Sequence, residues 1–127
     1  MYEAGKASLD NSFDFAITTT ADGKTNIPYT ISVTTDENNT LDDSYVKVYL
    51  QKDGVPVVNP IFISELTNYV DRNSSKELYS SEDIFSEKGE KITHYTLKLW
   101  VDKNFEVTAD NNKTYKLKVN VDSLMLR

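Results

Sequence analysis

The segment Tyr95-Thr96-Leu97-Lys98-Leu99-Trp100-Val101 decides the fold class, because every odd position carries a large apolar or aromatic side chain. Successive side chains of a β-strand point to opposite faces of the sheet, so this period of two gathers those side chains on one face. The same alternation recurs at 13–17, 27–33, 46–50 and 115–121. Strands that are apolar on one face only are typical of antiparallel sheets that share a core.

We therefore predict an all-β fold, an antiparallel two-sheet sandwich of the jelly-roll or Ig-like kind, with residues 1–127 as a single domain. One sheet alone would leave its apolar face in water. The predicted core comprises inward positions of the alternating segments: Phe15, Ile17, Ile31, Val33, Val48, Leu97, Leu99, Leu117 and Val119.

Turn residues separate the predicted strands. Residues 21–24 predict a tight turn, and Lys52-Asp53-Gly54 predicts a hairpin because Asp and Gly tolerate positive φ. The strand that follows at 55–58 is expected at a sheet edge, since Pro56 and Pro60 cannot donate to a ladder.

Residues 62–90 are less regular than the rest. Ser64 to Val70 fits either one helical turn or a short strand. The pairs Leu78-Tyr79 and Ile84-Phe85 flank the polar segment 80–83, and we expect them to tuck under the rim of the sandwich.

Composition disfavours several classes of protein. The net charge is −6, so phosphate backbones and anionic membranes repel the chain, and we expect no nucleic-acid partner. No apolar run is long enough to span a bilayer, so we expect no membrane insertion of this fragment. The absence of cysteine excludes disulfides, thiolate metal sites and a Cys nucleophile.

The single histidine, His94, excludes any site that needs two imidazoles. A Ser–His–Asp site around His94 would still be possible, but the chain has no Gly-x-Ser-x-Gly elbow. We interpret His94 as a rim residue at the start of a strand. We predict that the protein is not an enzyme and has no catalytic residue and no cofactor.

Loops rich in Asp and Asn are the candidate calcium sites, because they offer carboxylate and amide oxygens. They lie at 36–39, 42–43, 102–104 and 110–112. None has the spacing of an EF-hand loop. We interpret these residues as turn formers that bond their own backbone, and we predict no metal site.

Trp100 lies on the opposite face from Leu97 and Leu99 by parity. One interpretation is an exposed aromatic hot spot for a partner. The other is a side chain covered by lysine stems on the outer sheet face, with Lys98, Lys116 and Lys118 as the candidates.

The segment 95–102, the Asx-rich loop after it and the segment 112–121 together resemble the closing hairpin of the camelysin/TasA-like exported sandwich proteins of Gram-positive bacteria. The upstream order 13–17, 29–31 and 46–50 is similar too. The resemblance implies export and assembly at the cell surface or in an extracellular matrix such as a biofilm. The peptidase activity associated with camelysin is not carried over, because the chain offers no metal motif.

We therefore predict a non-enzymatic extracellular structural protein of matrix or filament type, secreted or at the cell surface. Its partners are expected to be proteins, or other copies of itself joined through sheet edges. The alternatives are an Ig-like adhesion or virion-surface binding domain and, less favoured, a metal-dependent peptidase.

The two ends of the chain bear on export and assembly. Residues 1–6 lack the apolar region of a signal peptide, so the protein either stays inside a cell or is a fragment whose leader was removed. Residues 7–10 and 123–126 are candidate strands for donation to a neighbour's sheet. The alternative for 124–126 is a simple extension of the final strand.

Overall fold

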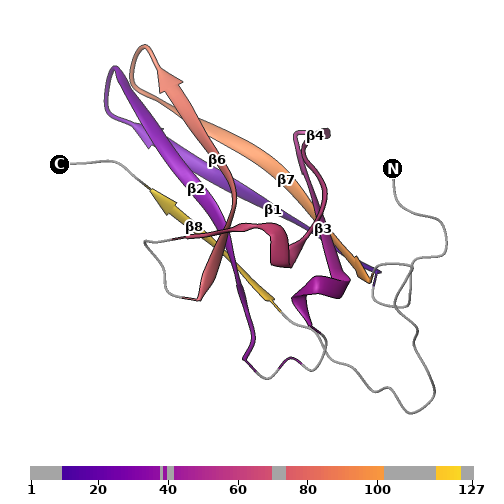
Figure 1. The fold of residues 1–127 in the computed structure, drawn as a ribbon. Helices are drawn as coiled ribbons and strands as arrows, with labels where there is room; N and C mark the ends of the chain where they lie inside the picture. The colour runs from indigo at the N-terminus through magenta and orange to yellow at the C-terminus, as the bar shows by residue number, and fades with distance from the viewer. Residues whose placement is uncertain (1–9, 38, 40–41, 70–73, 102–116, 124–127) are drawn as a thin grey trace.

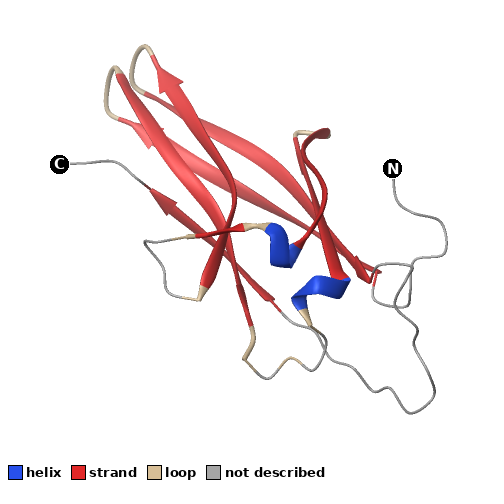
Figure 2. Ribbon diagram, viewed as in Figure 1, coloured by secondary structure: helices blue, strands red, loops and turns tan. Residues whose placement is uncertain are grey.

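The structure is a computed structural model that describes residues 10–37, 39, 42–69, 74–101 and 117–123. Its strands are β1 (Asp10–Ala21), β2 (Thr25–Thr35), β3 (Val46–Lys52), β4 (Val55–Phe62), β5 (Thr67–Asn68), β6 (Ser75–Phe85), β7 (Gly89–Val101) and β8 (Leu117–Ser123). Two short 3-10 helices, η1 (Asp43–Tyr45) and η2 (Ile63–Glu65), are the helical elements of these ranges (Figure 2).

The strands form two four-stranded sheets with the orders β1-β7-β3-β4 and β5-β6-β2-β8 (Figure 1). Every strand pairing is antiparallel. The sheets pack against each other through the apolar faces that the alternation defines. The predicted all-β two-sheet sandwich is therefore confirmed.

Two three-residue connections carry the chain from one sheet to the other, in addition to the segment 63–66 between β4 and β5. Residues 22–24 join β1 to β2, and residues 86–88 join β6 to β7. Both lie at the same end of the molecule, the upper left of Figure 1, where Ala21 pairs with Gly89 and Thr25 pairs with Phe85. The predicted turn at 21–24 is present, and it bridges the two sheets.

The hairpin at 52–54 joins β3 to β4 as predicted. Asp53 and Gly54 have φ values of 50° and 83°, the left-handed region that a tight two-residue hairpin turn requires. β4 lies at the edge of its sheet, and its register with β3 is irregular. The segment after it contains both of the forms that were expected, η2 followed by the two-residue strand β5.

The prediction that Leu78-Tyr79 and Ile84-Phe85 tuck under the rim is wrong. Both pairs lie in β6, an interior strand that pairs with β2 and β5. A register shift at Ile31/Ser32 leaves Leu78 without an opposite residue, so Leu78 and Tyr79 both reach the core. The sequence of β6 does not show the period of two, because polar Asp83 lies at a position that faces the core.

The closing hairpin expected from 95–102 and 112–121 is not formed by the residues of these segments that the structure describes, 95–101 and 117–121. β7 lies in the first sheet, whereas β8 pairs with β2 in the second sheet. Alternation shows which face of a strand is buried, but both sheets bury the same kind of face. The pattern therefore could not identify the partner of β8.

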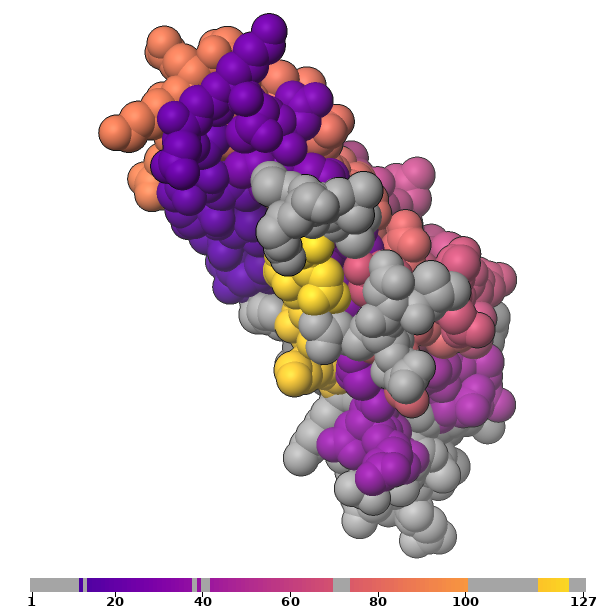
Figure 3. All heavy atoms as spheres, turned by 90° about the vertical axis from the view of Figure 1, so that its left-hand side faces the viewer, coloured from indigo at the N-terminus to yellow at the C-terminus, as the bar shows by residue number. Residues whose placement is uncertain are grey.

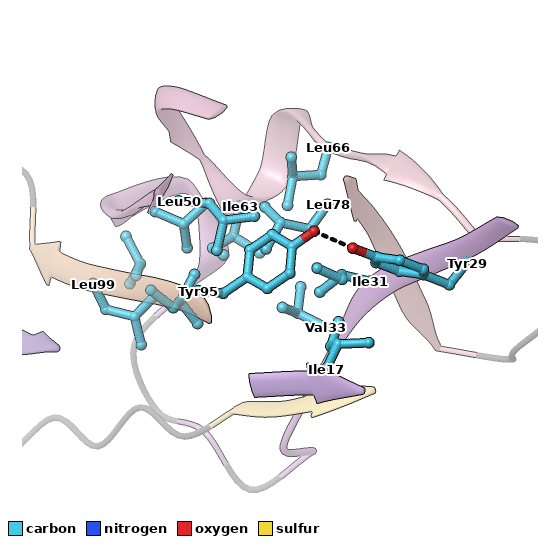
Figure 4. Packing of buried hydrophobic residues seen from close by; sticks show 13 residues of the cluster. Ile17, Tyr29, Ile31, Val33, Leu50, Ile63, Leu66, Leu78, Tyr95 and Leu99 are labelled. Carbon is cyan, nitrogen blue, oxygen red and sulfur yellow. Dashed lines mark hydrogen bonds between the residues drawn. The ribbon is translucent and has the colours of Figure 1, made fainter. Parts of the chain in front are cut away.

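The predicted core is confirmed (Figure 4). Ile17, Ile31, Val33, Val48, Leu97 and Leu99 are buried in one cluster, and Phe15, Leu117 and Val119 pack against it. The prediction omitted further members of the cluster: Tyr29, Val46, Leu50, Ile63, Leu66, Leu78 and Tyr95.

Candidate functional site

Polar side chains enter the interior of the sandwich near the inter-sheet connections. Thr19 of β1, Asp83 of β6 and Thr93 of β7 are all buried between the sheets. Each lies in phase with apolar core positions of its own strand, such as Ile17, Phe85 and Tyr95. This cluster is the candidate site, because buried polar groups need partners and are often functional.

Asp83 is the centre of this cluster and is only 1% exposed. Thr19 Oγ1 donates a hydrogen bond of 2.7 Å to Asp83 Oδ2. Lys91 Nζ lies 3.7 Å from Asp83 Oδ1, and the lysine side chain is 55% exposed. A buried carboxylate is costly unless it is paired and hydrogen-bonded, and Asp83 has both kinds of partner.

Thr93 differs from its neighbours in the cluster. Its Oγ1 is buried and has no hydrogen-bond partner among the residues that the structure describes. A buried hydroxyl without a partner loses the hydrogen bonds that it makes with water in the unfolded chain. Thr93 is therefore a local cost to the stability of the fold.

Two tyrosine hydroxyls meet in the middle of the interior. The hydroxyl oxygens of Tyr29 and Tyr95 are 2.5 Å apart, and either can be the donor (Figure 4). The ring of Phe15 stacks on Tyr95 at a centroid distance of 5.4 Å. Burial, followed by the hydrogen bond with Tyr29, raises the pKa of the Tyr95 hydroxyl far above its usual value. Tyr95 therefore keeps its proton at physiological pH.

Lys52 reaches the same interior from the end of β3. Its Nζ donates a hydrogen bond of 2.8 Å to Ser81 Oγ and lies 5.8 Å from the centroid of the Tyr79 ring. The ammonium thus links the first sheet to β6 of the second by a polar contact and a cation–π contact.

His94 does not lie at the start of a strand, as expected, but within β7 opposite Ala16. Its side chain is exposed. The main-chain N–H of His94 donates to Asp53 Oδ1 at 3.0 Å, and the N–H of Asp53 donates to the His94 carbonyl oxygen at 2.7 Å. The Asp53 carboxylate therefore braces the β3–β4 turn against the backbone of β7.

The Asx-rich segments that the structure describes form turns. Asp42 caps η1 by accepting hydrogen bonds from the backbone N–H and the hydroxyl of Ser44. These bonds lower the pKa of Asp42. The Asp36 carbonyl accepts the N–H of Asn39. Within the described ranges, no three His, Asp or Glu side chains are grouped to hold a metal ion. The segments 102–104 and 110–112 lie outside those ranges.

The interpretation of Trp100 as an exposed hot spot is wrong, because its exposed fraction is 0%. Lys118, one of the lysines expected to cover it, belongs to β8 in the other sheet, and Lys116 lies outside the described residues. Parity identified the face on which Trp100 lies, but the burial of that face depends on contacts distant in sequence.

A groove of about 430 Å³ lies beside β4, η2 and β6. It is lined by Ile61, Glu65, Leu66, Thr67, Glu77 and Leu78. Apolar side chains and two carboxylates thus share this groove, which could bind a side chain that is both apolar and cationic. No signal in the sequence indicated it, because its residues come from the irregular region 61–67 and from β6, which meet only in the folded chain.

No protein-family model, no curated protein and no solved structure matches this chain. Among the residues that the structure describes, no helix is long and apolar enough to cross a membrane.

Proposed function

We propose that this chain is a non-enzymatic extracellular structural protein, secreted or at the cell surface, that associates through its sheet edges into a matrix-type assembly. Among the residues that the structure describes, β8 is an edge strand of its sheet, and this observation carries the proposal. Unpaired N–H and C=O groups on an edge strand can pair with another strand, and proteins normally protect such edges.

The sheets have four edges, at β1, β4, β5 and β8, and the last three differ in their protection. β4 contains Pro56 and Pro60 and has an irregular register with β3. β5 is only two residues long. β8, by contrast, contains no proline, and its pairing with β2 is unbroken from Leu117 to Ser123. Of these edges, β8 is the best suited to accept another strand.

The chemistry of the interior supports a structural role rather than catalysis. The cluster around Asp83 lies between the sheets, where the Asp83 carboxylate accepts a hydrogen bond from Thr19 and lies near the ammonium of Lys91. A catalytic carboxylate would have to contact a substrate. The resemblance to camelysin/TasA-like proteins supports export and assembly. It gives no basis for peptidase activity in this chain.

The groove between β4, η2 and β6 favours a second candidate function, an adhesion or binding domain. Its apolar residues and the carboxylates of Glu65 and Glu77 suit a basic and partly apolar side chain of a protein partner. The substitution of both glutamates by Gln would weaken such a complex and leave self-association unchanged.

Sedimentation velocity over a wide range of protein concentrations tests the proposed function. We expect reversible self-association, together with no peptide hydrolysis when calcium or zinc is added. A species that stays monomeric at every concentration would contradict the assembly role. Metal-dependent turnover above background would favour the peptidase alternative instead.

A further inference from the structure

The two sheets are offset from each other by one strand. Sheets pack about 10 Å apart, and a residue spans at most about 3.6 Å of chain. The connections 22–24 and 86–88 can therefore bridge the sheets only if β1 lies over β2 and β7 lies over β6. The sheet orders then place β8 beyond β1, so that no described strand of the first sheet lies opposite β8.

The exposure of β8 agrees with this offset. Leu117 and Val119 face the interior but are only half-buried, and Val121 on the same face is 43% exposed. Figure 3 views this side of the molecule, where β8, in yellow, lies at the surface.

We propose that β8 pairs antiparallel with β8 of a second copy of this chain, about a two-fold axis that passes midway between the Asn120 residues of the two copies. This inference rests on the proposed function and names its partner and its register. The pairing places Lys118 opposite Asp122 of the second copy, and Asp122 opposite the second copy's Lys118. Val119 and Val121 face each other across the same pair of strands.

The sequence of β8 is self-complementary in this register. In an antiparallel pair, opposite residues lie on the same face, and opposite charges there are stabilising whereas like charges are destabilising. Lys118, Asn120 and Asp122 share one face of β8, and Val119 and Val121 share the other. The two-fold axis therefore repeats each favourable pair, as an isologous contact requires.

Other symmetric registers are less favourable. A slip of two residues removes both ion pairs, and a slip of four places Lys118 opposite Lys118 or Asp122 opposite Asp122. Each copy has a net charge of −6, so the two copies repel each other at long range. Association then depends on local charge matching, which the register centred on Asn120 provides.

Such pairing would join the second sheets of two copies into one continuous sheet. The edges at β4 and β5 would remain at the two outer ends, where proline and short length limit further addition. The contact is closed, so we expect a dimer as the basic unit of assembly.

Two charge variants and their mixture test this pairing by sedimentation velocity. Lys118→Glu places a carboxylate opposite Asp122 of the second copy. Asp122→Lys places an ammonium opposite Lys118 of the second copy. We expect the dimer dissociation constant of each variant alone to be about tenfold to hundredfold higher than that of the wild type. In a 1:1 mixture both pairs are again opposite in charge, so a heterodimer of near wild-type affinity should form. Circular dichroism of each variant checks that it is folded.

Disulfide trapping tests the register, since the chain has no cysteine of its own. Asn120→Cys places two thiols directly opposite, with a Cα separation of about 4.5–5.5 Å that suits a disulfide. Val121→Cys is the matched control. Its thiol is more exposed, but the Cα atoms at position 121 of the two copies lie about 8 Å apart. We expect rapid crosslinking of Asn120→Cys and slow crosslinking of Val121→Cys.

The outcomes separate this inference from the function on which it rests. If the wild type associates but the mixed variants do not restore the dimer, the pairing is wrong and the assembly role stands. Faster crosslinking through position 121 than through position 120 also overturns the pairing. A wild type that stays monomeric overturns both.

Discussion

The two halves of the interior are equally buried but differ in chemistry. Away from the inter-sheet connections, the sheets meet through aliphatic side chains such as Val33, Val46 and Leu97, all fully buried. Near the connections, they meet through Thr19, Asp83 and Thr93. Apolar burial is non-directional and stabilises in proportion to area, whereas a buried polar group stabilises only where its partner is correctly placed.

This difference indicates distinct roles for the two halves. The apolar half provides most of the stability, because each aliphatic side chain there is removed from water. The polar half restricts how the sheets can be superposed: Thr19 and Asp83 are 64 residues apart in sequence and meet only when the sheets pack so that β1 comes close to β6. We hypothesise that this pair selects the sheet alignment, and the Asp83 variants below measure what the pair contributes to stability.

The largest effect is expected in the apolar half. Leu97→Ala should lower the free energy of unfolding by about 2–5 kcal/mol, because it removes fully buried methyl groups and leaves a cavity. Ile92→Ala on the same strand is the control. Because Ile92 is 53% exposed, this substitution should lower the free energy of unfolding by no more than about 0.5 kcal/mol. Urea denaturation measures both. Equal losses would contradict the assignment of the core.

Removal of the buried carboxylate should cost less. Asp83→Ala leaves the Thr19 hydroxyl buried without its acceptor, at a cost of about 1–3 kcal/mol. Lys91 contributes little to this cost, because its ammonium can turn to water. Asp83→Asn keeps an oxygen that can accept from Thr19 and should lose less. If urea denaturation gave equal losses for the two variants, the hydrogen bond would not be the important contact.

The tyrosine pair should show a smaller effect with a specific pH dependence. Tyr95→Phe removes the hydroxyl that pairs with Tyr29, at a cost of about 1 kcal/mol near neutral pH. Because the pKa of Tyr95 is raised in the folded protein, the unfolded chain loses this proton first as the pH rises. The contribution of Tyr95 to stability should therefore be constant below about pH 10, the usual tyrosine pKa, and fall above it.

Denaturation of the wild type and of Tyr95→Phe between neutral and alkaline pH measures this contribution. The variant should lose less stability above pH 10 than the wild type does, because it lacks the group with the raised pKa. Parallel curves for the two proteins would show that Tyr95 does not cause the alkaline loss.

The smallest effect is expected at Thr93, and it is a gain. Thr93→Val replaces a buried hydroxyl that has no described partner with a methyl group of similar shape. The free energy of unfolding should rise by about 0.5–1 kcal/mol, because the variant no longer buries an unpaired polar group. Thr19→Val is the matched control and should be destabilising, since Thr19 donates to Asp83. A loss of stability in Thr93→Val would mean that its hydroxyl does have a partner.

Much of the fold could be read from the sequence, because alternation is a local property. The period of two at 13–17, 27–33, 46–50 and 95–101 identified strands and the faces they bury. The hairpin at Asp53-Gly54 and the edge position of β4 followed from turn chemistry and proline, which are local as well.

Tertiary structure alone decided which strands pair and which polar residues are buried. Alternation is identical for either sheet, so it could not place β8 beside β2 instead of β7. Asp83 has the composition of a surface residue, and its burial depends on Thr19 and Lys91, which other strands supply. The candidate site was therefore not predictable, because its residues meet only after the two sheets have packed together.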